Sequence, residues 1–371
     1  MPALALTAVA IWALMRPLHP GAGQLAAVAF LTAFGLTPFV RMLAVRTGAL
    51  DHPDQRKRHA ETTPKLGGVA VIAAFVLALG QRPLVDHELL VIALCALVLM
   101  LAGALDDTRG MSARLRLGLQ IACSLAAVTA GVRLDLVPGP AGKVVNIALS
   151  VLWMVGITNA YNFIDGIDGL AASLGALIAL LLALFARGAD QPGLVIVCTA
   201  LAGALLGFLP HNLRAGRPAS IFLGDSGSAS VGFLLAALAI KEDWAEGDPL
   251  VALAAPVLIF SVLIYDMVRT TVARIATGRV RSFQQWIAFV GRDHIHHRFS
   301  DLLGGPRAAL VLILSLALGL GLSALGLRRG DSVQAVLFLV QGALVLLVVA
   351  VLEGAAARTP GRRKPGREDR G

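Results

Sequence analysis

Charged residues are scarce in this sequence, and their scarcity excludes an ordinary soluble domain. Asp, Glu, Lys and Arg together make up 15% of the 371 residues, whereas 57% are hydrophobic. Apolar windows of about 15 to 21 residues recur along the whole chain, and a helix needs about 20 residues to cross a bilayer. The composition therefore predicts a polytopic membrane protein.

Cysteines and two common active-site motifs are also scarce or missing. The three cysteines, Cys95, Cys123 and Cys198, lie in apolar windows without paired spacing, so neither a disulfide nor a cysteine-based metal site is predicted. The sequence contains neither the GxxxxGK[ST] phosphate loop nor the HExxH zinc motif. The absence of these motifs excludes nucleotide binding by a phosphate loop and HExxH-type zinc catalysis. Aromatic residues are also scarce, at 5% of the chain.

The apolar windows predict an all-α integral membrane protein with about eleven transmembrane helices. The windows are residues 24–44, 67–80, 87–105, 115–131, 144–160, 170–187, 193–210, 228–241, 249–267, 308–327 and 333–352. A twelfth stretch, residues 3–16, lacks the charged start and the cleavage site of a signal peptide. We interpret residues 1–23 as a retained helix or interfacial segment, residues 24–352 as the transmembrane domain and residues 353–371 as a basic, disordered tail. Whether residues 3–16 span the membrane stays open.

The positive charges fall mainly on one side of the predicted helices. Of the 32 Lys and Arg residues, 24 lie on the connections 41–66, 106–116, 211–225 and 269–307 or in the tail after residue 353. Positive residues near helix ends stay in the cytoplasm. The long loops and the C-terminus are therefore predicted to be cytoplasmic. This asymmetry accounts for the net charge of +9 without nucleic-acid binding.

Five polar motifs lie on this same predicted side, whereas the opposite connections are short and bland. The motifs are DHPDQRKRHAETTPKLGG (51–68), LDDTRGMSARLR (105–116), NAYNFIDGIDGL (159–170), FLPHNLRAGRPASIFLGDSGS (208–228) and GRDHIHHRF (291–299). Ionisable groups at membrane depth are expensive to bury. Their concentration on one face predicts a functional site there.

Two of the motifs place paired acids at the ends of apolar helices. Asp106 and Asp107 can reach a common cation or act as a base, although a solvated loop with Ser112 as the next helix cap is the simpler alternative. Asp165 and Asp168 are three residues apart, and each precedes a glycine that frees the backbone to turn. A helix cap explains one acid of this second pair but not both, so the second motif favours a functional role.

Asp225 lies where a Gly- and Ser-rich segment opens the next helix. The free amides at such a helix start suit an anion such as a phosphate, whereas the Asp225 carboxylate does not. A divalent cation between the two resolves the conflict, and Mg²⁺ takes one or two carboxylates and leaves its other positions to phosphate and water. The motif therefore favours a diphosphate held through Mg²⁺.

Basic groups complete the set. His294, His296 and His297 lie beside Arg298 and can donate to phosphate oxygens or move a proton. A zinc site is the rival interpretation, but no cysteine is near, and the many oxygen donors favour Mg²⁺ or Mn²⁺. Lys65, next to two glycines at a helix start, is the best candidate for a nucleotide phosphate. A solvated loop is the alternative for both motifs.

Together these groups indicate phosphoryl-type transfer at the membrane face, with one lipid and one soluble cytoplasmic substrate. An ion-coupled transporter is a rival from another class, because acids inside a membrane also mark ion pathways. A transporter would place acids at the middle of its helices and open to both faces. Here the acids cluster at helix ends on one face, which favours the enzyme.

The motifs RKRHAETTPKLGG, LDDTRGMSARLRL, NAYNFIDGIDGLAA, IFLGDSGS and HIHHRF, in this order, resemble the polyprenyl-phosphate N-acetylhexosamine-1-phosphate transferases, the MraY/WecA type of glycosyltransferase family 4. The resemblance covers about residues 24–327, and the HIHH form is similar to the WecA branch. It implies Mg²⁺-dependent transfer of N-acetylglucosamine-1-phosphate from UDP-GlcNAc to undecaprenyl phosphate with release of UMP, the initiating step of cell-envelope glycans such as the lipopolysaccharide O-antigen. A same-family alternative uses UDP-MurNAc-pentapeptide or another UDP-N-acetylhexosamine.

The resemblance also implies roles for residues and a location. It implies that Asp225 and Asp107 bind the metal, that Asp106, Asp107, Asp165 and His294 are catalytic, and that Lys65, Asn162, Gly166, Asp168, Asn212, Phe222, His296, His297 and Arg298 bind substrate. Within that last group, Gly166 and Asp168 would recognise the uracil edge and Phe222 would stack on the ring. The implied location is the bacterial inner membrane with a cytoplasmic active site; a homodimer stays open.

Overall fold

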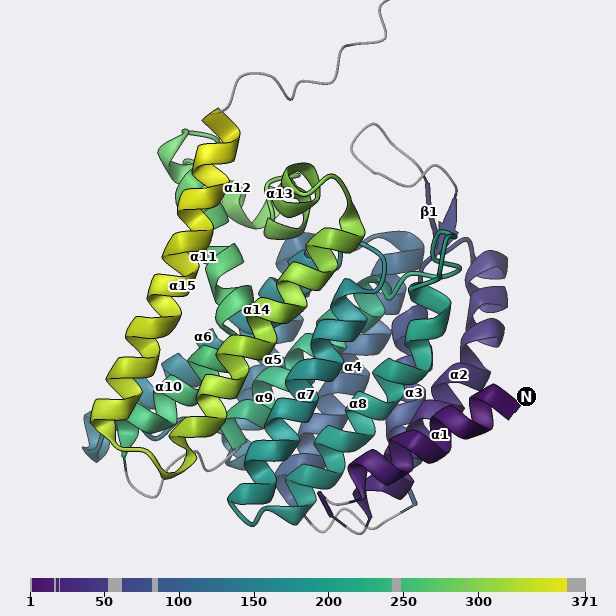
Figure 1. Cartoon of the computed structure of the whole chain (residues 1–371), viewed down its shortest axis with the longest axis horizontal. Helices are drawn as coiled ribbons and strands as arrows, with labels where there is room; N and C mark the ends of the chain where they lie inside the picture. Colours follow the sequence, from purple (N-terminus) through teal and green to yellow (C-terminus); the bar gives the residue numbers. More distant parts are fainter. Residues whose placement is uncertain are drawn as a thin grey trace, which may run out of the picture.

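The computed structural model describes residues 2–16, 18–19, 21–52, 62–81, 86–241, 248–289 and 291–358, and it is a bundle of helices (Figure 1). The helices are α1 (Pro2–Met15), α2 (Ala22–Thr47), α3 (Gly67–Leu79), α4 (His87–Arg109), α5 (Ala113–Ala130), α6 (Gly139–Ile164), α7 (Leu170–Gly188), α8 (Pro192–Asn212), α9 (Gly224–Lys241), α10 (Pro249–Ile259), α11 (Ser261–Ala276), α12 (Phe283–Ala288), α13 (Ile295–Leu302), α14 (Pro306–Gly326), the 3₁₀ helix η1 (Leu327–Arg329) and α15 (Ser332–Arg358). Two short strands, β1 (Leu50–Asp51) and β2 (Thr63–Pro64), form an antiparallel pair. The predicted all-α class is confirmed.

Every predicted apolar window lies on a helix, but fewer helices meet the length and composition of a membrane span. Among the residues that the structure describes, seven do so: α2, α4, α6, α7, α8, α14 and α15. The window 249–267 is broken into α10 and α11, which meet at an angle of 78° and would make an eighth span if taken together. The helix α3 is short, and α5 and α9 begin with charged and polar turns. The count of eleven spans therefore stays a prediction.

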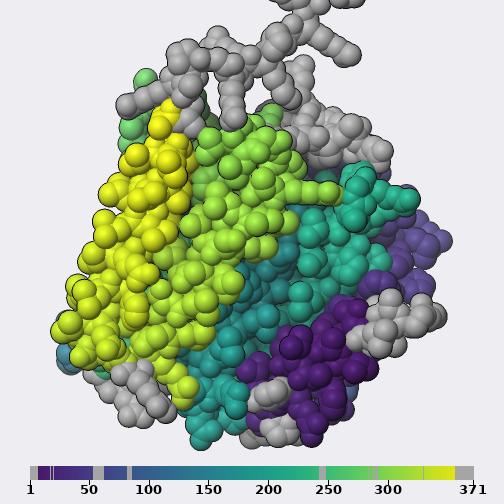
Figure 2. All heavy atoms as spheres, in the orientation of Figure 1, coloured from purple at the N-terminus to yellow at the C-terminus, as the bar shows by residue number. Residues whose placement is uncertain are grey.

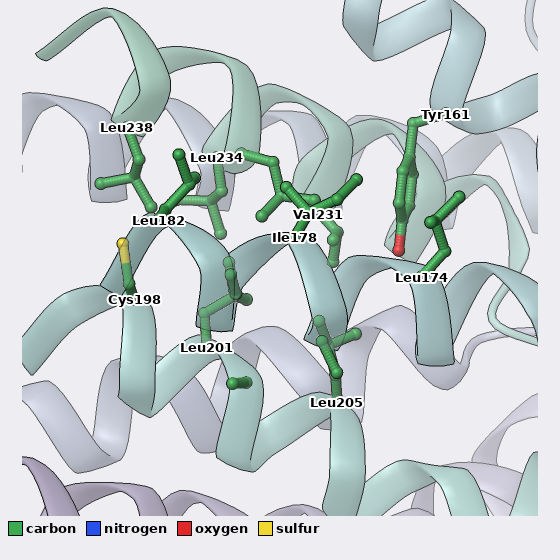
Figure 3. Packing of buried hydrophobic residues seen from close by; sticks show 14 of the residues in the cluster. Tyr161, Leu174, Ile178, Leu182, Cys198, Leu201, Leu205, Val231, Leu234 and Leu238 are labelled. Carbon is green, nitrogen blue, oxygen red and sulfur yellow. The ribbon is translucent and has the colours of Figure 1, made fainter. Parts of the chain in front are cut away.

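The core of the bundle lies among α7, α8 and α9. Figure 3 shows Ile178 and Leu182 of α7 meeting Leu201 of α8 and Leu234 of α9. In both α7 and α8, 72% of the span is buried, compared with 17% in α15. Between membrane helices this burial stabilises the bundle through van der Waals packing rather than through removal of apolar surface from water. The core thus forms a fixed base for the helix ends that carry the polar motifs.

Glycines let the first turn of α9 approach its neighbours closely. A Cβ at Gly68 of α3 would overlap the backbone of Gly227, and a Cβ at Gly103 of α4 would overlap the carbonyl group of Asp225. Any larger residue at either position would force the helices apart. These contacts fix where Asp225 lies relative to α3 and α4.

The C-terminal helices form one side of the molecule, with α14 packed beside α15 (Figure 2). Helix α15 continues past residue 352 to Arg358, so the residues at the start of the predicted tail are helical. Glu353 is buried there rather than solvated. Residues 359–371, the rest of the predicted tail, lie outside the described residues, as do residues 53–61 of the first motif. Helix α1 packs on α2, and its possible span stays open.

Candidate active site

The predicted site motifs lie at one end of the bundle. Figure 1 shows β1 at this end together with α12 and α13. Hydrogen bonds made by Asp107 and Asn162 join the ends of α4 and α6 to the start of α9. Lys65 is bridged to Phe222, and the N–H of Phe222 donates to the carbonyl of Pro64 (2.8 Å). The first motif and the loop before α9 are thereby joined, as shared membership of one site requires.

Asp107 caps the start of α9. The N–H groups of Asp225 and Ser226 donate to Oδ1 and Oδ2 of Asp107, at 3.1 and 3.0 Å. Asp107 as a residue is 4% exposed, and Lys65 Nζ lies 3.7 Å from Oδ1. A carboxylate at a helix N-terminus meets both the free amides and the positive end of the helix dipole. Asp107 therefore ties α4 to α9 and fixes Asp225 beside it.

Asp106 and Asp225 share one arginine. Arg116 Nη1 lies 3.1 Å from Asp106 Oδ2 and 3.7 Å from Asp225 Oδ1. Met111 N–H donates to Asp106 Oδ1, and Asn162 Nδ2 donates to Asp225 Oδ1 (2.9 Å). Within the described residues, Asp225 Oδ2 has no hydrogen-bond donor. Asp225 thus combines a fixed position with one oxygen that is available to a ligand.

Asp165 adds a fourth acid at the end of α6. Burial, followed by the carboxylates of Asp225 and Asp107, raises the pKa of Asp165 to about 7. A hydrogen bond from the Gly224 backbone lowers this pKa in part. Four acids from α4, α6 and α9 therefore repel one another across a small region, and a cation would relieve that repulsion.

The donor set fits Mg²⁺ better than zinc. No group of three or more His, Cys, Asp or Glu poised to hold a metal occurs in the part of the chain that the structure describes. Mg²⁺ does not need such a cage, because it takes one or two carboxylates and completes its shell with water and substrate phosphate. Asp225 Oδ2 can supply one ligand. Asp107, whose two oxygens each accept an amide, can supply another only through a remaining lone pair.

A groove opens beside the acids between α4, α5, α6 and α9. Its lining residues are Leu99, Ala102, Gly103, Ala113, Arg116, Leu117, Leu119, Gln120, Asn159, Asn162, Phe163, Asp225 and Ala229. Arg116 and Asp225 lie together in this lining, and the rest is made of leucines, alanines, a glycine and a phenylalanine with the amides of Gln120, Asn159 and Asn162 among them. A ligand with an anionic head and an apolar chain matches this combination.

The loop between α8 and α9 is held by residues that were predicted to bind the nucleotide. Asp168 Oδ2 accepts from Ala219 N–H (2.8 Å). Asn212 is buried; its Oδ1 accepts from Gly169 N–H, and its Nδ2 donates to the carbonyl of Ile221. Both side chains therefore position Phe222 and the start of α9. Their contacts to a nucleotide, and that of the half-buried Phe222, stay predictions.

The three histidines have different surroundings. His296 is buried against Gly166, where any side chain would overlap its ring. The ring of His297 lies next to that of His296, with centroids 4.1 Å apart. His294 stacks on Phe163, which lines the groove, at 4.9 Å. The structure thus brings Gly166 and His296 together and places His294 one layer behind the groove.

Two buried charged residues that the motifs did not single out hold His294. Asp266 Oδ2 lies 2.7 Å from Nδ1, and Arg274 Nη2 lies 3.2 Å from Nε2. Arginine can only donate, so Nε2 accepts and the proton of a neutral imidazole lies on Nδ1, facing Asp266. Arg274 also forms a two-pronged ion pair with Asp293. Asp266 could have been found as an acid inside the apolar window 249–267.

Arg298, predicted to bind substrate, points into the protein. Its Nε donates to Glu353 Oε1 (3.1 Å), its Nη1 donates to Thr270 and the carbonyl of Asp293, and its Nη2 donates to Asp266 Oδ1 (3.4 Å). Arg269 also pairs with Glu353, at 2.7 Å. The structure therefore uses Arg298 to join α13 to α15, and its contact with substrate stays a prediction.

Comparison with known proteins gives both a family and relatives. The sequence profile of glycosyl transferase family 4 matches residues 89–242. The chain is 30% identical over 311 residues to a probable undecaprenyl-phosphate N-acetylglucosaminyl 1-phosphate transferase of Bacillus subtilis, covering 81% of this chain and 83% of that protein. It is 32% identical to the decaprenyl-phosphate N-acetylglucosaminephosphotransferase of Mycolicibacterium smegmatis (77% and 76% covered). It is 31% identical to the undecaprenyl-phosphate alpha-N-acetylglucosaminyl 1-phosphate transferase of Escherichia coli K12 (74% and 75% covered).

Proposed function

Because the chain belongs to glycosyl transferase family 4, we propose that it is a multi-pass membrane enzyme that transfers N-acetylglucosamine-1-phosphate from UDP-GlcNAc to polyprenyl phosphate. The products are polyprenyl-diphosphate-GlcNAc and UMP. The observation that carries the proposal is the groove, whose lining combines Arg116 and Asp225 with leucines, alanines and a few amide side chains. The names of the relatives support the lipid phosphate acceptor and the transferred N-acetylglucosamine phosphate, and the groove supports the acceptor.

The reaction exchanges one phosphoanhydride bond for another. A phosphate oxygen of the acceptor attacks the β-phosphorus of UDP-GlcNAc, and the bond from this phosphorus to the bridging oxygen breaks. UMP leaves with that oxygen. Phosphoryl transfer of this kind depends mainly on positioning and on neutralising charge. The chain's own groups therefore act chiefly by holding the two substrates in line.

We assign the acids to different tasks on the basis of their partners. Asp225, with Oδ2 available, is the best ligand for Mg²⁺, and Asp107 fixes its position and stands as a second ligand. A bound Mg²⁺ would neutralise the charge on the diphosphate. Asp106 pairs with Arg116, which lines the groove, and is thereby placed to accept a proton from the acceptor phosphate. Asp165 supplies further negative charge on the cation side.

The remaining groups serve the nucleotide-sugar. Lys65 lies beside Asp107 and Phe222, so it can meet a phosphate of the donor while Phe222 offers its ring to uracil. Gly166, which directly follows Asp165 in the sequence, lies against the ring of His296. The predominance of Lys and Arg on the connections at this end supports a cytoplasmic, inner-membrane orientation.

A donor-exchange assay tests the proposal. Purified protein with polyprenyl phosphate and Mg²⁺ is expected to release UMP from UDP-GlcNAc and to form a lipid-linked sugar. UDP-MurNAc-pentapeptide in place of UDP-GlcNAc is expected to give little product. The result that would overturn the proposal is the absence of UMP release with every UDP-amino sugar, and efficient use of the pentapeptide donor would reassign the substrate. Asp225→Ala serves as the inactive control.

A further inference from the structure

A second polar pair lies inside the groove, away from the acids. Asn159 Nδ2 of α6 donates to Gln120 Oε1 of α5 (2.7 Å) and to the carbonyl of Val155 (2.8 Å). Both residues line the groove, and Gln120 is only 6% exposed. The two bonds fix the orientation of both amides, since the carbonyl oxygen of Gln120 must face the Asn159 donor. The Gln120 Nε2 group is therefore directed away from Asn159.

Within the part of the chain that the structure describes, Gln120 Nε2 has no acceptor and Asn159 Oδ1 has no donor. The neighbouring walls are Leu99, Leu117 and Leu119. Neither atom is among the fully buried side-chain atoms that lack a partner, so both open toward the groove, where a ligand can reach them. A leucine would serve these positions better if they only packed. The pair therefore points to polar atoms of a ligand.

The position of the pair along the helices identifies which part of a ligand it meets. Gln120 follows Arg116 by four residues on α5, and Asn159 precedes Asn162 by three residues on α6, so each lies on the same face one turn further from the acids. One turn is about 5.4 Å. Arg116 and Asn162 both contact Asp225. A lipid whose phosphate reaches Asp225 would have its ester linkage near Gln120.

We propose that Gln120 and Asn159 form a subsite for the phosphate-ester end of the polyprenyl phosphate acceptor. Gln120 Nε2 donates to a phosphate or ester oxygen, and Asn159 holds the Gln120 amide in the orientation that allows this bond. The subsite rests on the proposed function, since it names residues that bind one of its two substrates. It predicts that losing the Gln120 donor weakens the acceptor and leaves the nucleotide-sugar unaffected.

Steady-state kinetics of Gln120→Leu with each substrate varied in turn tests the subsite. A hydrogen bond to a charged group contributes enough that its loss is expected to raise KM for polyprenyl phosphate about tenfold, with KM for UDP-GlcNAc unchanged. Gln120→Glu keeps the oxygen that faces Asn159 and replaces the donor by an acceptor. It is expected to raise the acceptor KM further, and because its shape is conserved it remains informative if the leucine variant does not fold.

Ser124→Ala is the matched control. Ser124 lies one turn further along α5, is buried, and donates to the carbonyl of Gln120 without lining the groove. Its KM values are expected to match those of the wild type, and thermal unfolding in detergent checks that all variants fold. An unchanged acceptor KM in both Gln120 variants, or an equal rise in KM for UDP-GlcNAc, would overturn the subsite. UMP release by the wild type is a separate readout, so the proposed function can stand when the subsite fails.

Discussion

Asp107 at the end of α4 and Asp225 in the first turn of α9 both place a carboxylate at the start of α9, yet their partners differ. Asp107 accepts two backbone amides and is almost fully buried, whereas Asp225 keeps one oxygen without a donor among the described residues. The contacts of Asp107 stabilise the fold as well as the site, whereas Asp225 has an oxygen available to bind a ligand. Substitution of the two residues should therefore separate stability from activity.

Asp107→Asn is expected to lower the free energy of unfolding by about 1–3 kcal/mol, because its NH₂ group would face a backbone N–H donor. Asp225→Asn is expected to leave stability near that of the wild type, because its carbonyl can still accept from Asn162. Both should reduce UMP release by at least about a hundredfold. Thermal unfolding in detergent beside the UMP assay measures this, and equal losses of stability would contradict the different roles.

His294 gives a second prediction at this scale. Asp266 and Arg274 hold its ring from both sides and the ring stacks on Phe163, so we predict that His294 positions Phe163 and that its predicted catalytic role is not proton transfer. His294→Asn keeps an N–H donor near Asp266 and is expected to retain the wild-type shape of the pH–rate profile. Its kcat should fall less than that of His296→Asn. Loss of one limb of the profile in His294→Asn would show instead that His294 carries a catalytic proton.

At the scale of elements, the close approach of α4 to α9 depends on a glycine. Gly103→Ala is expected to lower the free energy of unfolding by about 1–3 kcal/mol, since its Cβ would overlap the carbonyl of Asp225. Gly118→Ala in α5 meets nothing within 4 Å and should be neutral or stabilising by up to about 1 kcal/mol. Thermal unfolding of the pair tests this, and similar melting temperatures would contradict the close contact.

The elements show which features the sequence could predict. Long apolar windows predict the positions of helices such as α4 and α7 well, because a membrane span needs a continuous run of apolar residues. The break between α10 and α11 was not predicted, because the window 249–267 is apolar across it. Asp266 and Gln120 were missed as site residues for a related reason: each lies inside a mainly apolar window, outside the polar motifs or at their edge, and only the packing shows what it contacts.

The candidate site could be predicted as a set of motifs but not as a set of contacts. Residue type and order indicated that Asp106, Asp107, Asp165 and Asp225 belong to one site. Hydrogen bonds between segments far apart in the chain decide which acid already accepts from backbone N–H groups, as Asp107 does. Asn212 illustrates the same limit, since its two bonds to Gly169 and Ile221 follow only from the fold.

At the scale of the whole molecule, the crowded acids predict a pH dependence. The pKa of Asp165 is raised to about 7 from an ordinary value near 4, so the folded state binds a proton that the unfolded state has lost. Without divalent cations, stability should therefore fall as pH rises from about 4 to about 7. Bound Mg²⁺ favours the ionised acids, so its stabilising effect should grow over the same range.

Melting temperatures at several pH values, with Mg²⁺ and with a chelator, test this behaviour. The difference between the two conditions is expected to be largest at and above about pH 7. In Asp225→Asn the difference should be much smaller, because the leading ligand is lost. A Mg²⁺ effect that is equal at pH 5 and pH 8, or that persists unchanged in this variant, would argue against the proposed cation site.

In the proposed function, the acids around Asp225 serve the transfer of a sugar together with its phosphate to a lipid phosphate. This transfer is tested most directly by identifying the nucleotide that purified protein releases from UDP-GlcNAc labelled in the β-phosphate, with polyprenyl phosphate as acceptor. One UMP is expected for each lipid-linked sugar, with the label in the lipid product. Release of UDP carrying the label, or no lipid product, would contradict the proposed function.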